Sequence, residues 1–241
     1  MAITGNTFYA GWDLALFSLA TNWKRYIKAQ IDIYLIGDVL EVGAGIGATT
    51  ATLHDGRARR WFCLEPDASR ASKLRALVAQ HADFAQPSVI VGSLCALAER
   101  PSFDCVVYVD VLEHIHDDRS QIDKSSQLVR PGGYIIILAP AHQWLFSEFD
   151  KNIGHLRRYD KIRLDSMRPT GWIEKKLWFL DSVGILLCLG NALVLRRAMP
   201  SRLQIYIWDR LCIPISRILD CLLFGKVGKS VVVVWQKQES E

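Results

Sequence analysis

The chain has 241 residues, of which 50% are hydrophobic and 22% charged, with a formal net charge of +4. This composition fits one domain with a sizeable core. Lysine and arginine are spread along the chain, which argues against a nucleic-acid partner. The six cysteines form no Cys-x-x-Cys pair, and the N-terminus shows no signal-peptide pattern. We therefore expect free thiols and a cytoplasmic location.

Residues 9–29 are expected to form a helical arm. Large apolar residues, including Trp12, Leu16, Trp23 and Ile27, recur in this stretch near helical spacing. The arm either packs against the sheet or forms a lid over a ligand pocket, because it precedes the first predicted strand.

The stretch Val39–Thr50 combines a strand with a glycine-rich turn. Apolar residues precede Gly43, Gly45 and Gly47, and a helix is expected from about Ile46. Glycine permits positive φ and a close approach of a ligand to the backbone. Such a turn before a helix is typical of a nucleotide or nucleoside site at the carboxyl edge of a parallel sheet. By itself it fits a dinucleotide and S-adenosylmethionine (SAM) equally well.

A second strand is predicted at Arg60–Glu65. Glu65 lies 18 residues after Gly47, close to the spacing at which a carboxylate receives ribose hydroxyls. The alternative is a carboxylate that stabilises a helix N-terminus, because Pro66 and Asp67 begin the next helix. We favour ribose binding.

Polar residues follow two further strands, Ser88–Val91 and Phe103–Val109. Ser93 and Leu94 are placed to contact an adenine, although a simple turn explains them nearly as well. Asp110 is placed to face a cationic amino group. Beyond it, Glu113, His114 and His116 form a candidate acid–base or metal cluster. Their spacing is not a standard metal pattern, so we expect no metal.

The next elements complete a doubly wound pattern. A helix at 118–128 ends at Arg130–Gly133, and Tyr134–Ala139 is a continuous apolar strand typical of the middle of a parallel sheet. Strands that alternate with helices up to residue 139 predict right-handed parallel crossovers.

At this point the chain resembles the class I SAM-dependent methyltransferases. Four motifs in the family's order carry the resemblance across roughly residues 38–140: Val39–Gly47, Leu64–Asp67, Phe103–Val107 with Asp110–His114, and Leu128–Gly133. The resemblance implies an α/β, Rossmann-like sheet of seven mostly parallel strands, helices on both faces and an antiparallel last strand. It also implies SAM as cofactor.

The resemblance assigns cofactor contacts. Glu41 and the turn, with Gly43, Ala44, Gly45 and Gly47, would hold the methionine part. Glu65, followed by Pro66, would hold the ribose, and Asp110 and Val111 would line the methionine and sulfur side. Ser93 and Leu94 would contact the adenine. Many members place an acid where this chain has Ser93, so the adenine contact departs from the family pattern.

The loop 140–159 is expected to supply catalytic and substrate residues, because it is polar, rich in aromatic residues and follows the last strand of the core. His155 is the candidate base, with Asp150 to orient it, and His114 is a second catalytic candidate. An arginine of the loop would grip a carboxylate or phosphate. The alternative is a surface loop held by ordinary ion pairs. The substrate candidates are His142, Trp144, Arg157, Arg158 and Tyr159.

Two more strands, 173–179 and 230–235, enclose an apolar insertion at 181–228. We expect two or three helices rather than membrane spans, because the runs are short or carry charges. They would cap the pocket, pair with a second copy, or lie on a membrane surface, given the flanking Arg196, Arg197 and Arg202.

The sequence as a whole predicts one methyltransferase domain with an arm (1–37), a SAM-binding core (38–140) and a substrate region (141–241). The expected reaction is methyl transfer from SAM to a small-molecule acceptor, most readily at a hydroxyl oxygen. The alternatives are N- or C-methylation on the same fold, a dinucleotide oxidoreductase, and a SAM-binding module without turnover. No second nucleotide-binding half follows the first, which disfavours the oxidoreductase.

Overall fold

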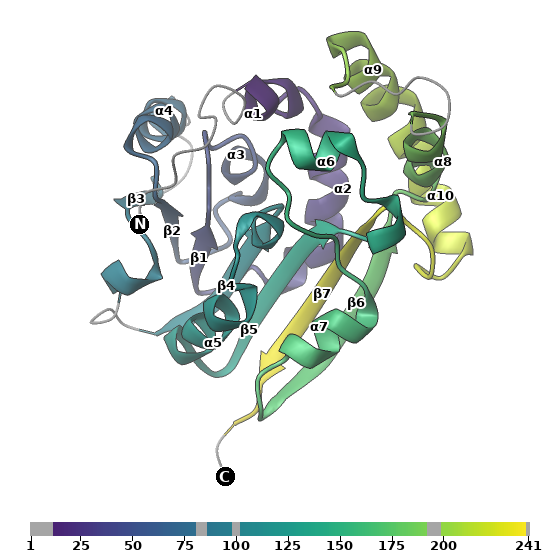
Figure 1. Ribbon diagram of the computed structural model, residues 1–241. Helices are drawn as coiled ribbons and strands as arrows, with labels where there is room; N and C mark the ends of the chain where they lie inside the picture. Colours follow the sequence, from purple (N-terminus) through teal and green to yellow (C-terminus); the bar gives the residue numbers. More distant parts are fainter. Residues whose placement is uncertain (1–11, 81–85, 98–101, 192–198, 240–241) are drawn as a thin grey trace.

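The computed structural model describes residues 12–80, 86–97, 102–191 and 199–239. Its centre is a seven-stranded sheet in the order β3-β2-β1-β4-β5-β7-β6, with β7 antiparallel to both of its neighbours (Figure 1). This is the expected α/β architecture. The strands are β1 (Asp38–Val42), β2 (Arg60–Glu65), β3 (Ser88–Val91), β4 (Phe103–Val109), β5 (Val129–Pro140), β6 (Trp172–Leu180) and β7 (Ser230–Lys237).

Helices cover both faces of the sheet (Figure 1). Along β1, Val39 packs into the layer with α2, whereas its neighbour Leu40 packs into the layer with α5 and α7, as the alternation of a strand requires. The helices are α1 (Trp12–Phe17), α2 (Thr21–Ile31), α3 (Thr50–Leu53), α4 (Ala68–Val78), α5 (Asp118–Leu128), α6 (Glu148–Asn152), α7 (Lys161–Met167), α8 (Ser182–Gly190), α9 (Arg202–Ile207) and α10 (Ile213–Leu222).

The N-terminal arm is two helices, not the single one predicted for residues 9–29. Its start, residues 9–11, lies outside the described residues. The break before α2 has a distant cause: the carboxylate of Asp209 accepts the backbone N–H groups of Asn22 (3.2 Å) and Trp23 (2.9 Å) and so starts a new helix. Leu16 and Ile27 are buried in the core, as packing against the sheet requires, and Leu14 lies close to Gly45; a lid over the pocket stays a prediction.

The helix after the glycine turn begins at Thr50 rather than at Ile46. Gly43, Gly45 and Gly47 have φ values of +71°, +59° and +88°, so the chain cannot enter a right-handed helix before Gly47. The fifth strand also starts earlier than predicted, at Val129, because Phe103 pairs with Val129 before an irregularity and regular pairing resumes at Cys105 and Tyr134.

The apolar insertion forms α8, α9 and α10, as predicted. The backbone stays helical from Arg202 to Leu222, because a π-helical turn, Trp208–Cys212, joins α9 to α10. Pro214 is tolerated in the first turn of α10, where its missing N–H costs little. Within the described residues, no helix has the length and apolar character needed to cross a bilayer.

Candidate functional site

The glycine turn is held in place by backbone hydrogen bonds to the neighbouring strand. The N–H groups of Gly43 and Ala44 donate to the carbonyl of Leu64, at 2.7 and 3.2 Å. A Cβ on Gly43 would lie 2.7 Å from Cγ2 of Val111, so only glycine fits at this close approach. Val111 therefore packs behind the turn and does not line the cavity described below.

Glu65 ends β2 beside this turn, as predicted. Its carboxylate is buried and accepts hydrogen bonds from the backbone N–H groups of Gly45 (2.8 Å) and Asp67 (3.0 Å). Asp67 is the N-cap of α4, so Glu65 also binds the start of that helix through the Asp67 N–H, as the alternative interpretation requires. The carboxylate has further lone pairs for hydroxyl donors. Ribose binding by Glu65 stays a prediction.

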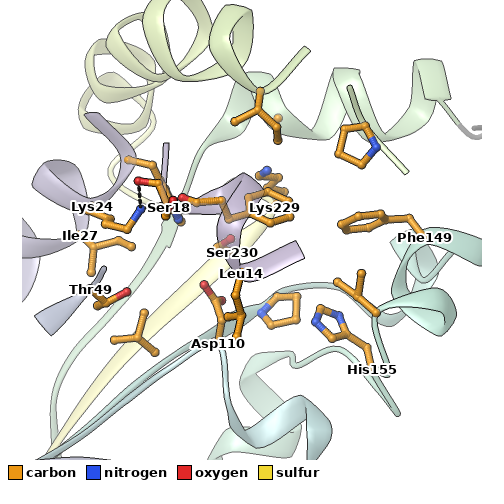
Figure 2. Close-up of a pocket in the computed structure, with 18 of the residues that line it drawn as sticks. Leu14, Ser18, Lys24, Ile27, Thr49, Asp110, Phe149, His155, Lys229 and Ser230 are labelled. Carbon is orange, nitrogen blue, oxygen red and sulfur yellow. Dashed lines mark hydrogen bonds between the residues drawn. The ribbon is translucent and has the colours of Figure 1, made fainter. Parts of the chain in front are cut away.

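A cavity of about 470 Å³ opens at the carboxyl edge of the sheet. Figure 2 shows residues from the arm, the β4 end, α6 and the start of β7 surrounding one space. Of the predicted cofactor residues, Glu41, Gly43, Ala44, Gly45 and Asp110 line it. The others are not among the residues that line it: Gly47, Glu65, Pro66, Ser93, Leu94 and Val111.

Asp110 stands at the end of β4 with φ of +53°, a backbone conformation that residues other than glycine rarely adopt. Its backbone N–H donates to the carbonyl of Leu138 at 3.0 Å, which fixes this turn. The exposed surface of the side chain faces the cavity. Desolvation by the surrounding protein raises the pKa of Asp110, whereas the charges of His155, Lys229 and Lys24 lower it. A cation that entered here would favour the ionised form of this carboxyl group.

His155 and Asp150 meet as predicted. Nδ1 of His155 lies 3.0 Å from Oδ1 of Asp150, and both residues line the cavity. Arg158 donates to both oxygens of the same carboxylate, Nε at 3.0 Å and Nη2 at 2.9 Å. Burial would raise the pKa of Asp150, but the hydrogen bonds from His155 and Arg158 outweigh it and lower the pKa to about 2. Asp150 is therefore ionised at neutral pH and orients the imidazole.

Behind this pair lies a buried carboxyl group. Both oxygens of Glu113 are buried without a hydrogen-bond partner, and Oε1 lies 3.6 Å from Nε2 of His155. Burial, followed by the charge of Asp110, raises the pKa of Glu113 well above its usual range. The direction of this shift favours the neutral acid, whose burial without partners costs less than that of a buried charge.

His114 is the other histidine at the cavity. Its Nδ1 lies 3.1 Å from the carbonyl of Gly154, and its ring centre lies 4.8 Å from that of His155. Burial, followed by the charge of His155, lowers the pKa of His114 to about 4, so the ring is neutral at pH 7. The ligand atoms of Glu113, His114 and His155 lie within 4.8 Å of one another and make a group that suits a metal ion.

His116 does not join this cluster, contrary to the prediction. It is exposed beyond the loop, and its carbonyl accepts a hydrogen bond from Arg157 at 3.1 Å. His155 takes the third place instead. The chain reverses after Glu113, and Leu156 donates its N–H to the carbonyl of Glu113, which brings the later loop alongside.

Several predicted substrate residues have structural partners instead. Arg157 pairs with Asp118 at 2.9 Å, and Tyr159, fully buried, donates its hydroxyl to the same carboxylate at 2.8 Å. Arg158 reaches the cavity wall, but its guanidinium is committed to Asp150.

The two aromatic candidates, His142 and Trp144, do not line the cavity. The ring of His142 stacks on Phe179 at 5.0 Å, and Trp144 is exposed on the surface. His142 has φ of +63°, which turns this segment away from the site.

Two lysines that line the cavity were not predicted from the sequence. Lys24 donates to the carbonyls of Phe17 (2.7 Å) and Ser18 (3.2 Å) at the end of α1, and burial lowers its pKa to about 8 against the charges of Asp209 and Asp110. Lys229 lies 3.3 Å from Asp181. Each resembles an ordinary surface lysine in the sequence, because its partners are carbonyls or a residue far away in the chain.

Glu41 is a buried carboxyl group next to the glycine turn. Its Oε2 accepts hydrogen bonds from Thr50 Oγ1 (2.8 Å) and Trp61 Nε1 (3.0 Å). Burial raises the pKa of Glu41 from its usual 4.5 to about 7, in spite of these bonds. Over this range the folded protein holds a proton on Glu41 that the unfolded chain releases. The contribution of this group to the free energy of unfolding therefore falls as the pH rises from about 4.5 to about 7.

We expect Glu41→Gln to remove this pH dependence. The glutamine amide has the shape of the protonated carboxyl group but does not titrate. The free energy of unfolding of the wild type should therefore fall by about 3 kcal/mol more than that of the variant between pH 4.5 and pH 8. Urea unfolding of both proteins at the two pH values measures the difference, and the subtraction cancels the other titrating groups. Parallel pH curves for the two proteins would show that Glu41 is ionised in the fold.

Comparisons with known proteins agree with this geometry. Residues 40–135 match a family model described as a methyltransferase domain. A ubiquinone biosynthesis O-methyltransferase from Alkalilimnicola ehrlichii is 32% identical over 103 residues, which cover 41% of this chain and 39% of that protein. The chain thus aligns with about two fifths of the length of the curated relatives it matches.

Solved structures extend the similarity of fold to nearly the whole chain. NodS, an N-methyltransferase from Bradyrhizobium japonicum solved with S-adenosyl-L-homocysteine, has a TM-score of 0.60 at 11% identity, covering 96% of this chain and all of that one. A Haemonchus contortus phosphoethanolamine N-methyltransferase solved with S-adenosyl-L-methionine has a TM-score of 0.63 at 15% identity, covering 96% and 56%.

Proposed function

We propose that this chain transfers a methyl group from SAM to a hydroxyl oxygen of a small molecule. The premise is that the chain has the class I methyltransferase fold and carries a methyltransferase domain at residues 40–135. The observation that carries the oxygen assignment is the pair His155 and Asp150 at the cavity wall. A hydroxyl acceptor needs a base as its oxygen attacks, whereas a neutral amine does not.

The residues around the cavity suit SAM. The glycine turn offers close backbone approach, Asp110 offers a carboxylate to a cationic amino group, and Glu65 has lone pairs left for sugar hydroxyls. When bound, SAM supplies a methyl group on a positively charged sulfur, which is an activated electrophile. Lys24 and Lys229 also line the cavity, and their charges favour the ionised form of Asp110.

The protein's part in the reaction is to hold the acceptor and take its proton. In the tautomer that donates Nδ1–H to ionised Asp150, Nε2 of His155 keeps a lone pair. The hydroxyl proton would pass to Nε2 of His155 as the acceptor oxygen attacks the methyl group that bound SAM would supply. Arg158 keeps Asp150 ionised and immobile. Alignment of the acceptor in the cavity supplies much of the remaining acceleration.

N-methylation is the second candidate, because two of the solved structures of this fold are named N-methyltransferases. The sequence relative is named an O-methyltransferase. These names describe those proteins, so the two reactions must be separated on this one.

Two measurements test the proposal. Calorimetry with SAM, S-adenosylhomocysteine and NAD should show binding of the first two alone, and binding of NAD alone would overturn the cofactor. Methyl-labelled SAM is then offered with acceptor pairs whose single nucleophile is a hydroxyl in one member and an amine in the other, such as phenol with aniline and longer-chain analogues. We expect label on the hydroxyl member; label confined to nitrogen would replace the oxygen assignment.

A further inference from the structure

The outer face of the helical insertion is unusually apolar. In the described part of the chain, thirteen of the twenty-one exposed large hydrophobic side chains lie between residues 186 and 227. Single exposed apolar residues are normal on a protein surface, but a contiguous group marks an interaction site. The group is Leu186, Leu187, Leu203, Tyr206, Ile207, Leu211, Ile215, Ile218, Leu219, Leu222, Leu223, Phe224 and Val227.

These side chains form a stripe along one helical path. The backbone is helical from Arg202 to Leu222, and exposed apolar residues recur every three or four positions along it. In α10 the inward side carries Ser216 and Asp220, whereas Ile218 (65% exposed) and Leu222 (67% exposed) point outward. The inward side of the path thus combines these polar groups with the apolar Ile205, Trp208 and Ile213, whereas the outward side is mostly apolar.

The inward polar groups are all engaged by the protein. Asp220 accepts the Tyr26 hydroxyl at 2.9 Å and the N–H of Asp181 at 2.6 Å. Asp209 caps α2. These bonds anchor the insertion to the domain and fix which side faces outward, and Figure 1 shows α8, α9 and α10 gathered at one end of the molecule.

The charges on this outer face have one sign. Asp209 and Asp220 are buried, while Arg202, Arg210, Arg217 and Lys226 are exposed. Between residues 199 and 228, all of which are described, the surface therefore offers cations and apolar groups but no exposed carboxylate. Arg196 and Arg197, which the sequence placed in the same patch, lie outside the described residues.

We propose that this face, residues 202–227, docks on an anionic bilayer surface. Its apolar stripe would enter the boundary between headgroups and acyl chains, and its arginines and Lys226 would meet lipid phosphates, which is how amphipathic helices bind membranes. A second copy is the weaker occupant. A twofold interface would bring the same cations toward each other with no exposed acid to pair with them.

The cavity reaches this same face. Leu187 (45% exposed) and Ile207 (43% exposed) both belong to the outer group and also line the cavity. Docking would therefore place the cavity mouth against the bilayer. If the proposed methyl transfer holds, its acceptor is a hydroxyl-bearing amphiphile drawn from the membrane.

Vesicle flotation tests the docking without any methyl transfer. The full chain is mixed with phosphatidylcholine vesicles containing phosphatidylglycerol and with pure phosphatidylcholine vesicles. We expect flotation with the anionic vesicles and at least about tenfold weaker binding for Ile218→Glu/Leu222→Glu. The control Ile33→Glu/Ile162→Glu changes two apolar residues outside this face that are at least as exposed as the test pair, and it should float like the wild type.

Melting temperature and SAM calorimetry establish that each variant is folded. The proposal is overturned if the wild type does not float, or if the Ile218→Glu/Leu222→Glu variant floats equally well. It is also overturned if light scattering shows a dimer for the wild type and a monomer for this variant, while neither protein binds vesicles. Because no acceptor is used, failure here leaves the methyl-transfer proposal standing, and an inactive protein that floats leaves the docking standing.

Discussion

Replacing His155 by alanine is expected to lower kcat by about 10²–10⁴-fold, the usual contribution of a general base. The imidazole is held at Nδ1 by Asp150, and its Nε2 is the atom that would accept the hydroxyl proton. Affinity for SAM should stay unchanged, because the glycine turn, Glu65 and Asp110 are left intact. Turnover at saturating acceptor and calorimetry with SAM measure the two quantities separately.

His116→Ala is the control for this prediction. It removes a histidine of the same region whose side chain is exposed and does not line the cavity. We expect normal turnover from it. If His155→Ala also kept normal turnover, His155 would leave the catalytic list, and the acceptor would be one that loses its proton without help, as an amine does.

The core of the sheet was predictable because its signals are local. β2, β3 and β4 fall on the predicted bounds, since each is a short apolar run between polar residues or turns. The arm was harder. Its break after Phe17 depends on Asp209, which lies 187 positions from Asn22, and no pattern within the arm encodes that partner.

The candidate site divides in the same way. His155 and Asp150 were paired correctly because five positions separate them on one loop. Arg157 and Tyr159 were misassigned because their carboxylate, Asp118, lies about forty positions earlier. The sequence does not show whether an arginine binds a substrate or pairs with a buried carboxylate of the protein. Only the fold distinguishes these two roles.

Asp150→Ala is expected to lower the free energy of unfolding by about 3–5 kcal/mol, the cost of breaking a buried ion pair. The carboxylate is fully buried. It accepts hydrogen bonds from Nε and Nη2 of Arg158 and from the backbone N–H of Ser147 at 2.8 Å, and it contacts the His155 ring. Its removal leaves the guanidinium of Arg158, only 6% exposed, without its anion.

Glu148→Ala in the same short helix is the matched control. Glu148 pairs with Lys151 at 2.6 Å, but both side chains are more than half exposed, so water and salt replace the interaction and the change should stay within about 0.5 kcal/mol. Urea unfolding at pH 7 compares the two. A small loss from Asp150→Ala would mean that water reaches Arg158 in the folded protein. The guanidinium would then be free to bind an anionic acceptor, which is the role that the sequence first suggested for it.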